Sequence, residues 1–210
     1  MKKHDTVSCL SRAFAVLLCL FCIASSHAQP DGWVNIRTAA PSIVLDIRYA
    51  TTNNFVNAQM YPCAECFLRS PAAEALLAAH SELQKQGYGL KMFDCYRPAP
   101  VQERLWAKMP DARYVTNPRK GSMHGRGGAA DLTIVDAQGK ELDMGTPFDY
   151  FGAKAYPDYP HLPANVLKNR LLLRTTMERH GFRHIRTEWW HFAYIPKQYS
   201  VANWEWECAK

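Results

Sequence analysis

The sequence has few of the features that mark repeats, flexible linkers, membrane-spanning helices or nucleic-acid binding. Its 210 residues contain no internal repeat, no low-complexity tract and no linker rich in glycine and serine, so nothing indicates a second domain. After residue 28, no apolar run is long enough to form a transmembrane helix. Lysine and arginine do not form long runs and acidic residues lie among them, which argues against a nucleic-acid-binding protein.

The first 28 residues differ from the rest of the chain. Basic residues precede an apolar run over residues 13–24, and small residues follow at Ser26 and Ala28. This pattern predicts a secretory signal peptide that is cleaved after Ala28, because the apolar run is too short to span a bilayer as a helix. An uncleaved N-terminal anchor is the alternative, since the segment before the apolar run is unusually long.

We therefore expect residues 29–210 to form one domain that works outside the cytoplasm, in the periplasm or as a secreted protein, without stable membrane association. Removal of residues 1–28 takes away three basic residues and one acid, so the formal net charge falls from +6 to +4. This charge is mild, and it is compatible with work near an anionic cell envelope.

Four of the seven cysteines remain after residue 28: Cys63, Cys66, Cys95 and Cys208. In a cytosolic protein, such a set would indicate a structural zinc site, whereas in an oxidising compartment it favours two disulfides. The sequence alone allows three pairings. We favour a bond between Cys66 and Cys95, because the helix and the strand that begin and end there should lie side by side.

Three segments have the periodicity and the end signals of helices. The clearest has Ser70 as its predicted N-cap, Pro71 at its first helical position and Gly87 as its stop. The other two cover Ala99–Met109, which is entered through prolines, and Ala164–Gly181, which ends on a glycine.

Three further segments are prone to form strands: residues 89–94, residues 130–136 and the aromatic stretch over residues 187–195. The mixture of helices and strands predicts an α+β protein in which helices pack on a small antiparallel sheet.

Two short stretches contain the residue types of a zinc site. His124 lies in a glycine-rich segment and Asp131 at the start of a predicted strand, so a turn between them can bring both side chains together. His191 would be the third ligand, from a neighbouring strand, and histidine nitrogen and carboxylate oxygen both suit zinc. Glu188, three residues before His191, is the candidate for the carboxylate that takes a proton from a zinc-activated water.

The spacing of Glu188 and His191 requires an irregular backbone between them if both side chains are to reach one metal. In a regular strand, residues i and i+3 point to opposite faces of the sheet. Both side chains therefore reach one metal only if the chain bends, bulges or turns at Trp189 and Trp190.

Each candidate also has an ordinary structural interpretation. Asp131 could cap a turn, and Glu188 could form a salt bridge with Arg183 or Arg186. The remaining histidines are weaker candidates. His80 and His180 fit the surface of a helix, whereas His161 and His184 lie in or beside irregular segments.

Two motifs give a resemblance to a known family. Residues 122–131, SMHGRGGAAD, resemble the S-x-H-x-x-G-x-A-x-D motif, and residues 188–191, EWWH, resemble the E-x-W-H motif. Both belong to the VanX-type D-alanyl-D-alanine dipeptidases, a branch of the zinc DD-peptidases in peptidase family M15. The similarity also covers residues 47–55, 93–98 and 142–149, so it extends over nearly all of the chain after residue 28.

This resemblance implies the fold of the DD-peptidases, which is hedgehog-like, with one Zn²⁺ per chain in a central cleft. It implies that His124, Asp131 and His191 are the zinc ligands and that Glu188 is the general base.

The resemblance also assigns residues that bind or polarise the substrate. It implies that Arg97 polarises the scissile carbonyl and stabilises the oxyanion, that Tyr49 and Asp149 bind the free ammonium, and that Ser122 binds substrate. Arg97 could instead form a structural ion pair with a residue such as Asp94. Asp149 could merely cap a turn.

The function that we predict is zinc-dependent hydrolysis of D-Ala-D-Ala or a related small dipeptide outside the cytoplasm. The alternatives are a D,D- or L,D-carboxypeptidase that acts on peptidoglycan stem peptides, and a zinc-containing module that binds wall peptides without catalysis. Glu188 argues against the module, because a binding site has no use for a base beside the metal. Export argues against a role in glycopeptide resistance, which needs the dipeptide destroyed in the cytoplasm.

Overall fold

The computed structural model describes residues 29–208, so the predicted signal peptide over residues 1–28 lies outside the described residues. Within the described range, no helix has both the length and the apolar character needed to cross a membrane.

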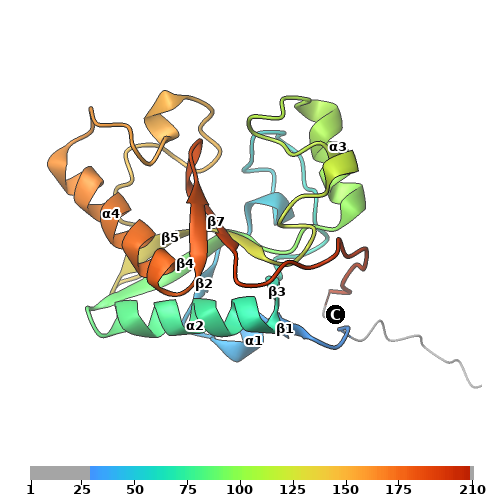
Figure 1. Cartoon of the computed structure of the whole chain (residues 1–210), viewed down its shortest axis with the longest axis horizontal. Helices are drawn as coiled ribbons and strands as arrows, with labels where there is room; N and C mark the ends of the chain where they lie inside the picture. The colour runs from blue at the N-terminus through green and yellow to red at the C-terminus, as the bar shows by residue number, and fades with distance from the viewer. Residues whose placement is uncertain (1–28, 209–210) are drawn as a thin grey trace, which may run out of the picture.

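A five-stranded sheet lies at the centre of the structure, in the order β2-β4-β5-β7-β6 (Figure 1). The bounds of its strands are Val44–Leu45 for β2, Tyr88–Asp94 for β4, Ala129–Asp136 for β5, Phe182–Ile185 for β6 and Glu188–Tyr194 for β7. Neighbouring strands are antiparallel except for the short edge strand β2, which runs parallel to β4. A second, two-stranded sheet pairs β1 (Trp33–Asn35) with β3 (Phe67–Arg69).

The helices lie around this sheet. They are α1 (Ile36–Ala39), α2 (Ser70–Gln84), α3 (Ala99–Lys108) and α4 (Ala164–Arg179), with 3-10 turns η1 (Arg48–Ala50), η2 (Pro118–Lys120) and η3 (Ala153–Ala155). α2 packs against β4, and α4 packs against β6 and α2. α3 lies apart from these two helices, at the opposite side of Figure 1 from α4.

The predicted α+β class is confirmed, with the parallel strand β2 as an addition to the antiparallel sheet. Each of the three predicted helices and three predicted strands forms. Two end signals were wrong by one position: Ser70 is the first residue of α2 rather than its N-cap, which is Arg69, and Pro71 is the second helical residue rather than the first. The reason is that Arg69 is also the last residue of β3, so the strand leads directly into the helix.

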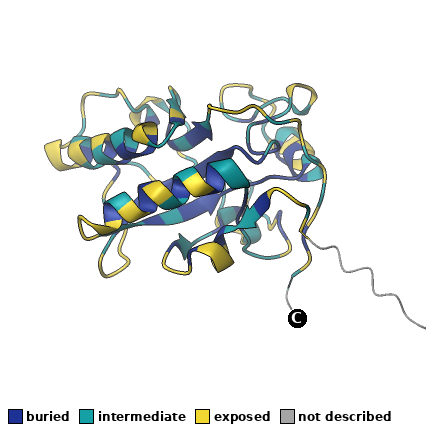
Figure 2. Ribbon diagram, turned by 60° about the horizontal axis from the view of Figure 1, so that its bottom comes forward, coloured by how far each residue is buried: buried dark blue, intermediate teal, exposed yellow. Residues whose placement is uncertain are grey.

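The core lies between α2 and the sheet. Figure 2 shows the residues of α2 alternating between buried and exposed along the helix. Leu76 and Leu83 are fully buried there, as are Leu90 on β4 and Leu132 on β5. Full burial of a leucine side chain is worth roughly 1.5–3 kcal/mol, so this layer gives β4 and β5 a rigid support.

His80 was wrongly predicted to lie on the surface of a helix, because α2 turns this side chain toward β4. His80 is buried, its Nδ1 accepts the Leu90 N–H at 3.2 Å, and its Nε2 lies 3.0 Å from Ser42 Oγ. Burial lowers the pKa of His80, which keeps the ring neutral and Nδ1 free to accept.

Two disulfides join the four cysteines, as predicted. Cys66 pairs with Cys95, which was the pairing that we favoured, and Cys63 pairs with Cys208. Cys66 directly precedes β3 and Cys95 directly follows β4, so the bond ties the small sheet to the end of a central strand.

Candidate active site

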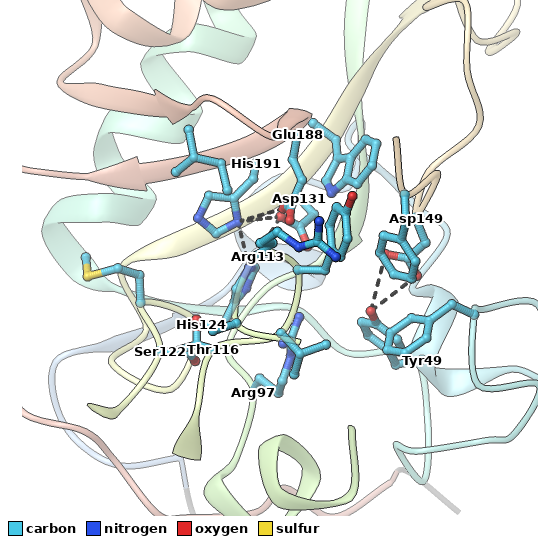
Figure 3. A pocket seen from close by; sticks show the side chains of 18 residues that line it. Tyr49, Arg97, Arg113, Thr116, Ser122, His124, Asp131, Asp149, Glu188 and His191 are labelled. Carbon is cyan, nitrogen blue, oxygen red and sulfur yellow. Dashed lines mark hydrogen bonds and ion pairs between the residues drawn. The ribbon is translucent and has the colours of Figure 1, made fainter. Parts of the chain in front are cut away.

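Three adjacent strands align acidic and histidine side chains in one row. Asp131 on β5 is paired with Asp94 on β4 at one side and with His191 on β7 at the other. His124 reaches the same point from the turn that precedes β5 (Figure 3). The residues predicted as a metal site from the sequence are therefore brought together.

The donor atoms of His124, Asp131 and His191 lie at the corners of a small triangle. His191 Nδ1 is 2.9 Å from Asp131 Oδ1 and 3.1 Å from His124 Nε2, and His124 Nε2 is 3.3 Å from Asp131 Oδ1. Zinc–ligand bonds of about 2.0–2.1 Å at tetrahedral angles place donor atoms roughly 3.3 Å apart. The triangle therefore fits a zinc ion.

The orientation of His124 supports the same conclusion. Its Nδ1 lies 2.7 Å from the carbonyl oxygen of Cys95, to which it donates a hydrogen bond. This bond leaves Nε2 with its lone pair toward Asp131 and His191, which is the arrangement in which an imidazole binds a metal.

The backbone of β7 bulges beside this triangle. His184 on β6 pairs with Phe192 on β7, but the next residue of β6, Ile185, pairs with Glu188. The residues of β7 between Glu188 and Phe192 therefore have no partners on β6. The bulge turns Glu188 to the side of His191, so that Glu188 Oε2 lies 4.0 Å from His191 Nδ1. The irregularity that we expected at Trp189 and Trp190 is confirmed.

Buried carboxylates dominate the electrostatics of the site. Burial alone would raise the pKa of Asp131, but the imidazoles of His124 and His191 hold it well below its usual range. The pKa of Glu188 is raised well above its usual value by burial and by the charges of Asp131 and Asp149. A divalent cation bound among these carboxyl groups would offset their mutual repulsion.

Arg97 follows β4 and has two sets of contacts. Its Nε and Nη2 donate to Asp94 Oδ2 at 3.0 and 2.6 Å, and its Nη1 donates to Gln102 Oε1 at 3.0 Å. Arg97 also lines the central pocket, and its guanidinium lies 5.1 Å from the centre of the Tyr49 ring. The structural ion pair with Asp94 thus exists, and it fixes the guanidinium at the pocket.

Tyr49 and Asp149 meet at the other end of the pocket (Figure 3). The Tyr49 hydroxyl lies 3.2 and 3.4 Å from the two carboxylate oxygens of Asp149, to which it donates. Burial and the charge of Asp131 raise the pKa of Asp149 to about 8, while burial keeps the pKa of Tyr49 well above its usual value. Asp149 has a positive φ of 59°, a conformation that aspartate tolerates better than most residues.

The turn that carries His124 depends on a glycine. Gly127 has a φ of 71°, and a Cβ at this position would overlap the Trp33 ring. Ser122 begins the same turn, is buried, and its Oγ accepts the Gly125 N–H at 2.9 Å. Gly127 therefore lets the chain return from His124 to β5 beneath the indole.

A family profile described as D-Ala-D-Ala dipeptidase, from the M15 peptidases, matches residues 29–207. The chain belongs to this dipeptidase family.

Individual members of the family are similar over most of their length. The D-alanyl-D-alanine dipeptidase of Escherichia coli K12 is 38% identical over 159 residues, which cover 76% of this chain and 82% of that protein. The D-alanyl-D-alanine dipeptidase of Enterococcus faecium is 31% identical over 175 residues, which cover 73% and 87%, respectively.

Two solved structures also show similarity. The LD-carboxypeptidase LdcB has a TM-score of 0.45 at 19% identity, over 80% of this chain and 70% of that one. The vancomycin-resistance D,D-pentapeptidase VanY, in complex with Zn(II), has a TM-score of 0.40 at 17% identity, over 61% and 73%.

In this member of the dipeptidase family, the pocket is lined by every residue to which the resemblance assigns a role, and it has a volume of about 220 Å³. That is below the range of roughly 300–1,000 Å³ for drug-sized ligands, so the pocket suits a small molecule. His161 and His184 do not line it. His184 instead lies 2.7 Å from Glu178 Oε1, and His161 packs against Tyr159.

Sequence reasoning missed several residues that border the pocket. Arg113 and Tyr114 come from the loop after α3, while Phe151 follows Asp149. None of them belongs to a motif or has a periodic spacing, so the sequence carried no signal for them beyond their position in loops beside recognised residues.

Proposed function

We propose that the chain is a zinc-dependent D,D-dipeptidase that hydrolyses free D-Ala-D-Ala or a closely related dipeptide. The observation that carries this proposal is the triangle of His124, Asp131 and His191 with Glu188 beside it, in a pocket of about 220 Å³. The choice of D-Ala-D-Ala as substrate follows the names of the related proteins, and the small pocket is consistent with a dipeptide.

In this proposal, His124, Asp131 and His191 hold one zinc ion. A bound zinc ion supplies Lewis acidity, which activates a water at neutral pH and polarises a carbonyl oxygen. The hydrogen bond from His124 to the carbonyl of Cys95 fixes the ring that offers Nε2 to the metal.

Glu188 acts as the general base. Its carboxylate takes a proton from the attacking water and then delivers it to the nitrogen of the leaving D-alanine. Its burial raises its pKa, which favours holding the proton between these two steps. The bulge of β7 keeps the carboxylate beside His191 rather than on the opposite face of the sheet.

Arg97 faces the oxygen of the scissile carbonyl. Asp94 and Gln102 engage one N–H on each of its three nitrogens, so the guanidinium is held in place while other N–H groups face the pocket. A donor fixed in advance stabilises an oxyanion without reorganising during the reaction.

The two ends of the dipeptide bind at opposite ends of the pocket. Asp149, oriented by the Tyr49 hydroxyl, pairs with the free ammonium. Ser122 Oγ accepts the Gly125 N–H, which leaves its own O–H available to donate, and we assign this donor to the substrate carboxylate. The substrate is thus recognised by both of its charges.

We further propose that residues 29–210 form one domain, that the protein works in the periplasm or after secretion, and that it degrades dipeptides released during wall turnover or taken as nutrients. Carboxypeptidase action on stem peptides is the second candidate. A small pocket that ends at a buried carboxylate disfavours it, because a longer peptide has no ammonium at that position.

Metal analysis followed by a hydrolysis assay tests the proposed function. Purified protein should contain one zinc per chain and release D-alanine from D-Ala-D-Ala; a chelator should abolish turnover and added zinc should restore it. L-Ala-L-Ala serves as the control for stereochemistry and a muramyl pentapeptide as the control for length. Faster cleavage of the pentapeptide than of the dipeptide would refute the dipeptidase proposal and identify the protein as a carboxypeptidase.

A further inference from the structure

Four aromatic rings form a continuous row along one side of the pocket. The ring of Tyr49 contacts Phe55 with centroids 6.2 Å apart, Phe55 contacts Phe151 at 5.1 Å, and Phe151 contacts Tyr114 at 4.6 Å. All four rings line the pocket. We call Phe55, Phe151 and Tyr114 the aromatic wall.

The three residues of the aromatic wall come from three separate loops. Phe55 lies in the loop after η1, Tyr114 in the loop between α3 and η2, and Phe151 in the segment before η3. Each ring is partly buried. Phe151 lies between the other two in the row, so it joins the three loops.

The wall stands next to the end of the pocket that is proposed to bind the ammonium. Phe151 is two residues from Asp149, and Phe55 meets the edge of the Tyr49 ring, whose hydroxyl donates to Asp149. A substrate whose ammonium pairs with Asp149 would therefore have its amine end next to these rings. An additional residue on the amine would need the space that the rings occupy.

We propose that the aromatic wall is the steric stop that limits the substrate to two residues, with Phe151 as the residue on which the stop depends. This inference rests on the proposed dipeptidase function and adds the residues that set substrate length. The pairing with Asp149 selects for charge, whereas the wall selects for size, and the two selections are separable because they reside in different side chains.

Two peptides separate the two selections. Propionyl-D-Ala, which is D-Ala-D-Ala without its amino group, lacks the ammonium and adds no bulk, so it reports mainly on Asp149. Gly-D-Ala-D-Ala keeps an ammonium but places it one residue further away, so it reports on the wall. Product analysis is required, since release of Gly-D-Ala and D-alanine means that the glycine has passed the wall.

The test compares wild-type protein with Phe151→Ala on these substrates. A phenyl ring is about the size of one alanyl residue, so the truncation opens a space for the extra glycine. The ratio of kcat/KM for Gly-D-Ala-D-Ala over D-Ala-D-Ala should rise by about 10-fold or more, in the range that one misfit group changes specificity. The ratio for propionyl-D-Ala should change much less, because this analogue has no group that reaches the wall.

Variants elsewhere keep the test informative. Phe55→Ala and Tyr114→Ala open the wall from the other two loops and should shift the same ratio in the same direction. Tyr150→Ala is the matched control, because this adjacent aromatic residue is exposed and does not line the pocket. Zinc content and thermal unfolding show whether each variant is folded.

The outcomes for the wall and for the proposed function are distinguishable. If wild-type protein does not hydrolyse D-Ala-D-Ala, the proposed function fails. If it does, but folded wall variants keep the wild-type ratio for the tripeptide, the wall is not the stop. A wild-type protein that cleaves the tripeptide as fast as the dipeptide would equally overturn the inference.

Discussion

The two sides of the pocket are built differently. On one side, Asp131, Glu188 and His191 lie on β5 and β7, and His124 lies in the turn that leads into β5. The helix α2 supports this sheet with buried leucines. On the other side, Tyr49 and Asp149 lie in or beside short turns, and the aromatic wall comes entirely from loops. We refer to these as the sheet side and the loop side.

The difference separates two tasks. A zinc site and a base must keep donor atoms within tenths of an ångström, which a hydrogen-bonded sheet provides. Selection of substrate by charge and length needs contacts around the substrate, and loops supply these from distant parts of the sequence. We therefore expect substitutions on the sheet side to remove chemistry and substitutions on the loop side to change selectivity.

The largest effect on the sheet side is expected from removal of a predicted zinc ligand. Alanine at His124, Asp131 or His191 should reduce bound zinc to a small fraction of the wild-type content, and turnover by more than about 10³-fold, because three-ligand sites tolerate no missing donor. Metal analysis and D-Ala-D-Ala hydrolysis measure both. His184→Ala, outside the pocket, is the matched control and should keep its zinc. Full zinc content in all three ligand variants would refute the assignment.

Glu188 separates loss of catalysis from loss of metal, because it lies on the sheet side without being a proposed ligand. Glu188→Gln should keep zinc and the melting temperature while kcat falls by about 10²–10⁴-fold, since the amide accepts no proton. Glu178→Gln is a control on the surface, where this carboxylate pairs with His184. Near-normal turnover of the zinc-loaded Glu188 variant would assign the base to another carboxylate of the pocket, with Asp149 the first to test.

Arg97 links the two sides, because it lies three residues after the end of β4 and its guanidinium lies over the Tyr49 ring. Arg97→Lys should lower kcat by about 10²–10³-fold with little change in KM, because it removes the planar donor that faces the oxyanion. Asp94→Asn should give a smaller loss of the same kind, as the guanidinium loses its charged partner. A change confined to KM would instead mean that Arg97 binds the ground state of the substrate.

The last prediction concerns stability rather than turnover, on the loop side. Folding raises the pKa of Asp149 from 3.8 to about 8, so the folded protein holds a proton that the unfolded chain releases between these values. This contribution to stability is complete below about pH 4 and is lost as the pH rises to about 8. Urea unfolding of metal-free protein should therefore show Asp149→Asn gaining stability relative to wild type from pH 5 to 8. A constant difference over this range would contradict the raised pKa.

The sequence predicted the sheet side more completely than the loop side. His124 and Asp131 lie seven residues apart in one motif, and Glu188 and His191 lie in another, so local spacing carried the information. The alternation of side chains along a strand even required the bulge at Trp189 and Trp190, and the structure has it.

Loop-side residues were predicted by resemblance or not at all. Tyr49 and Asp149 are separated by 100 positions, and no periodicity connects them. Phe55, Tyr114 and Phe151 escaped notice because loop geometry depends on the packing of the whole chain rather than on local spacing.

His80 shows a different kind of error. It follows Leu76 by four positions and precedes Leu83 by three, which places it on the buried stripe of α2. The spacing indicated burial, and the polarity of histidine was given too much weight. Its two ring nitrogens found partners in Ser42 and Leu90, which is how a core accommodates a neutral imidazole.

The two disulfides also determine what a single proteolytic cut can do. One bond closes a covalent ring from Cys63 to Cys208, and the other closes a smaller loop from Cys66 to Cys95 inside it. Any single break of the backbone between Cys63 and Cys208 therefore leaves the two pieces covalently joined. A nicked molecule would keep the mobility of an intact chain on a non-reducing gel and separate into fragments only after reduction, and both sides of its pocket would remain tethered to each other.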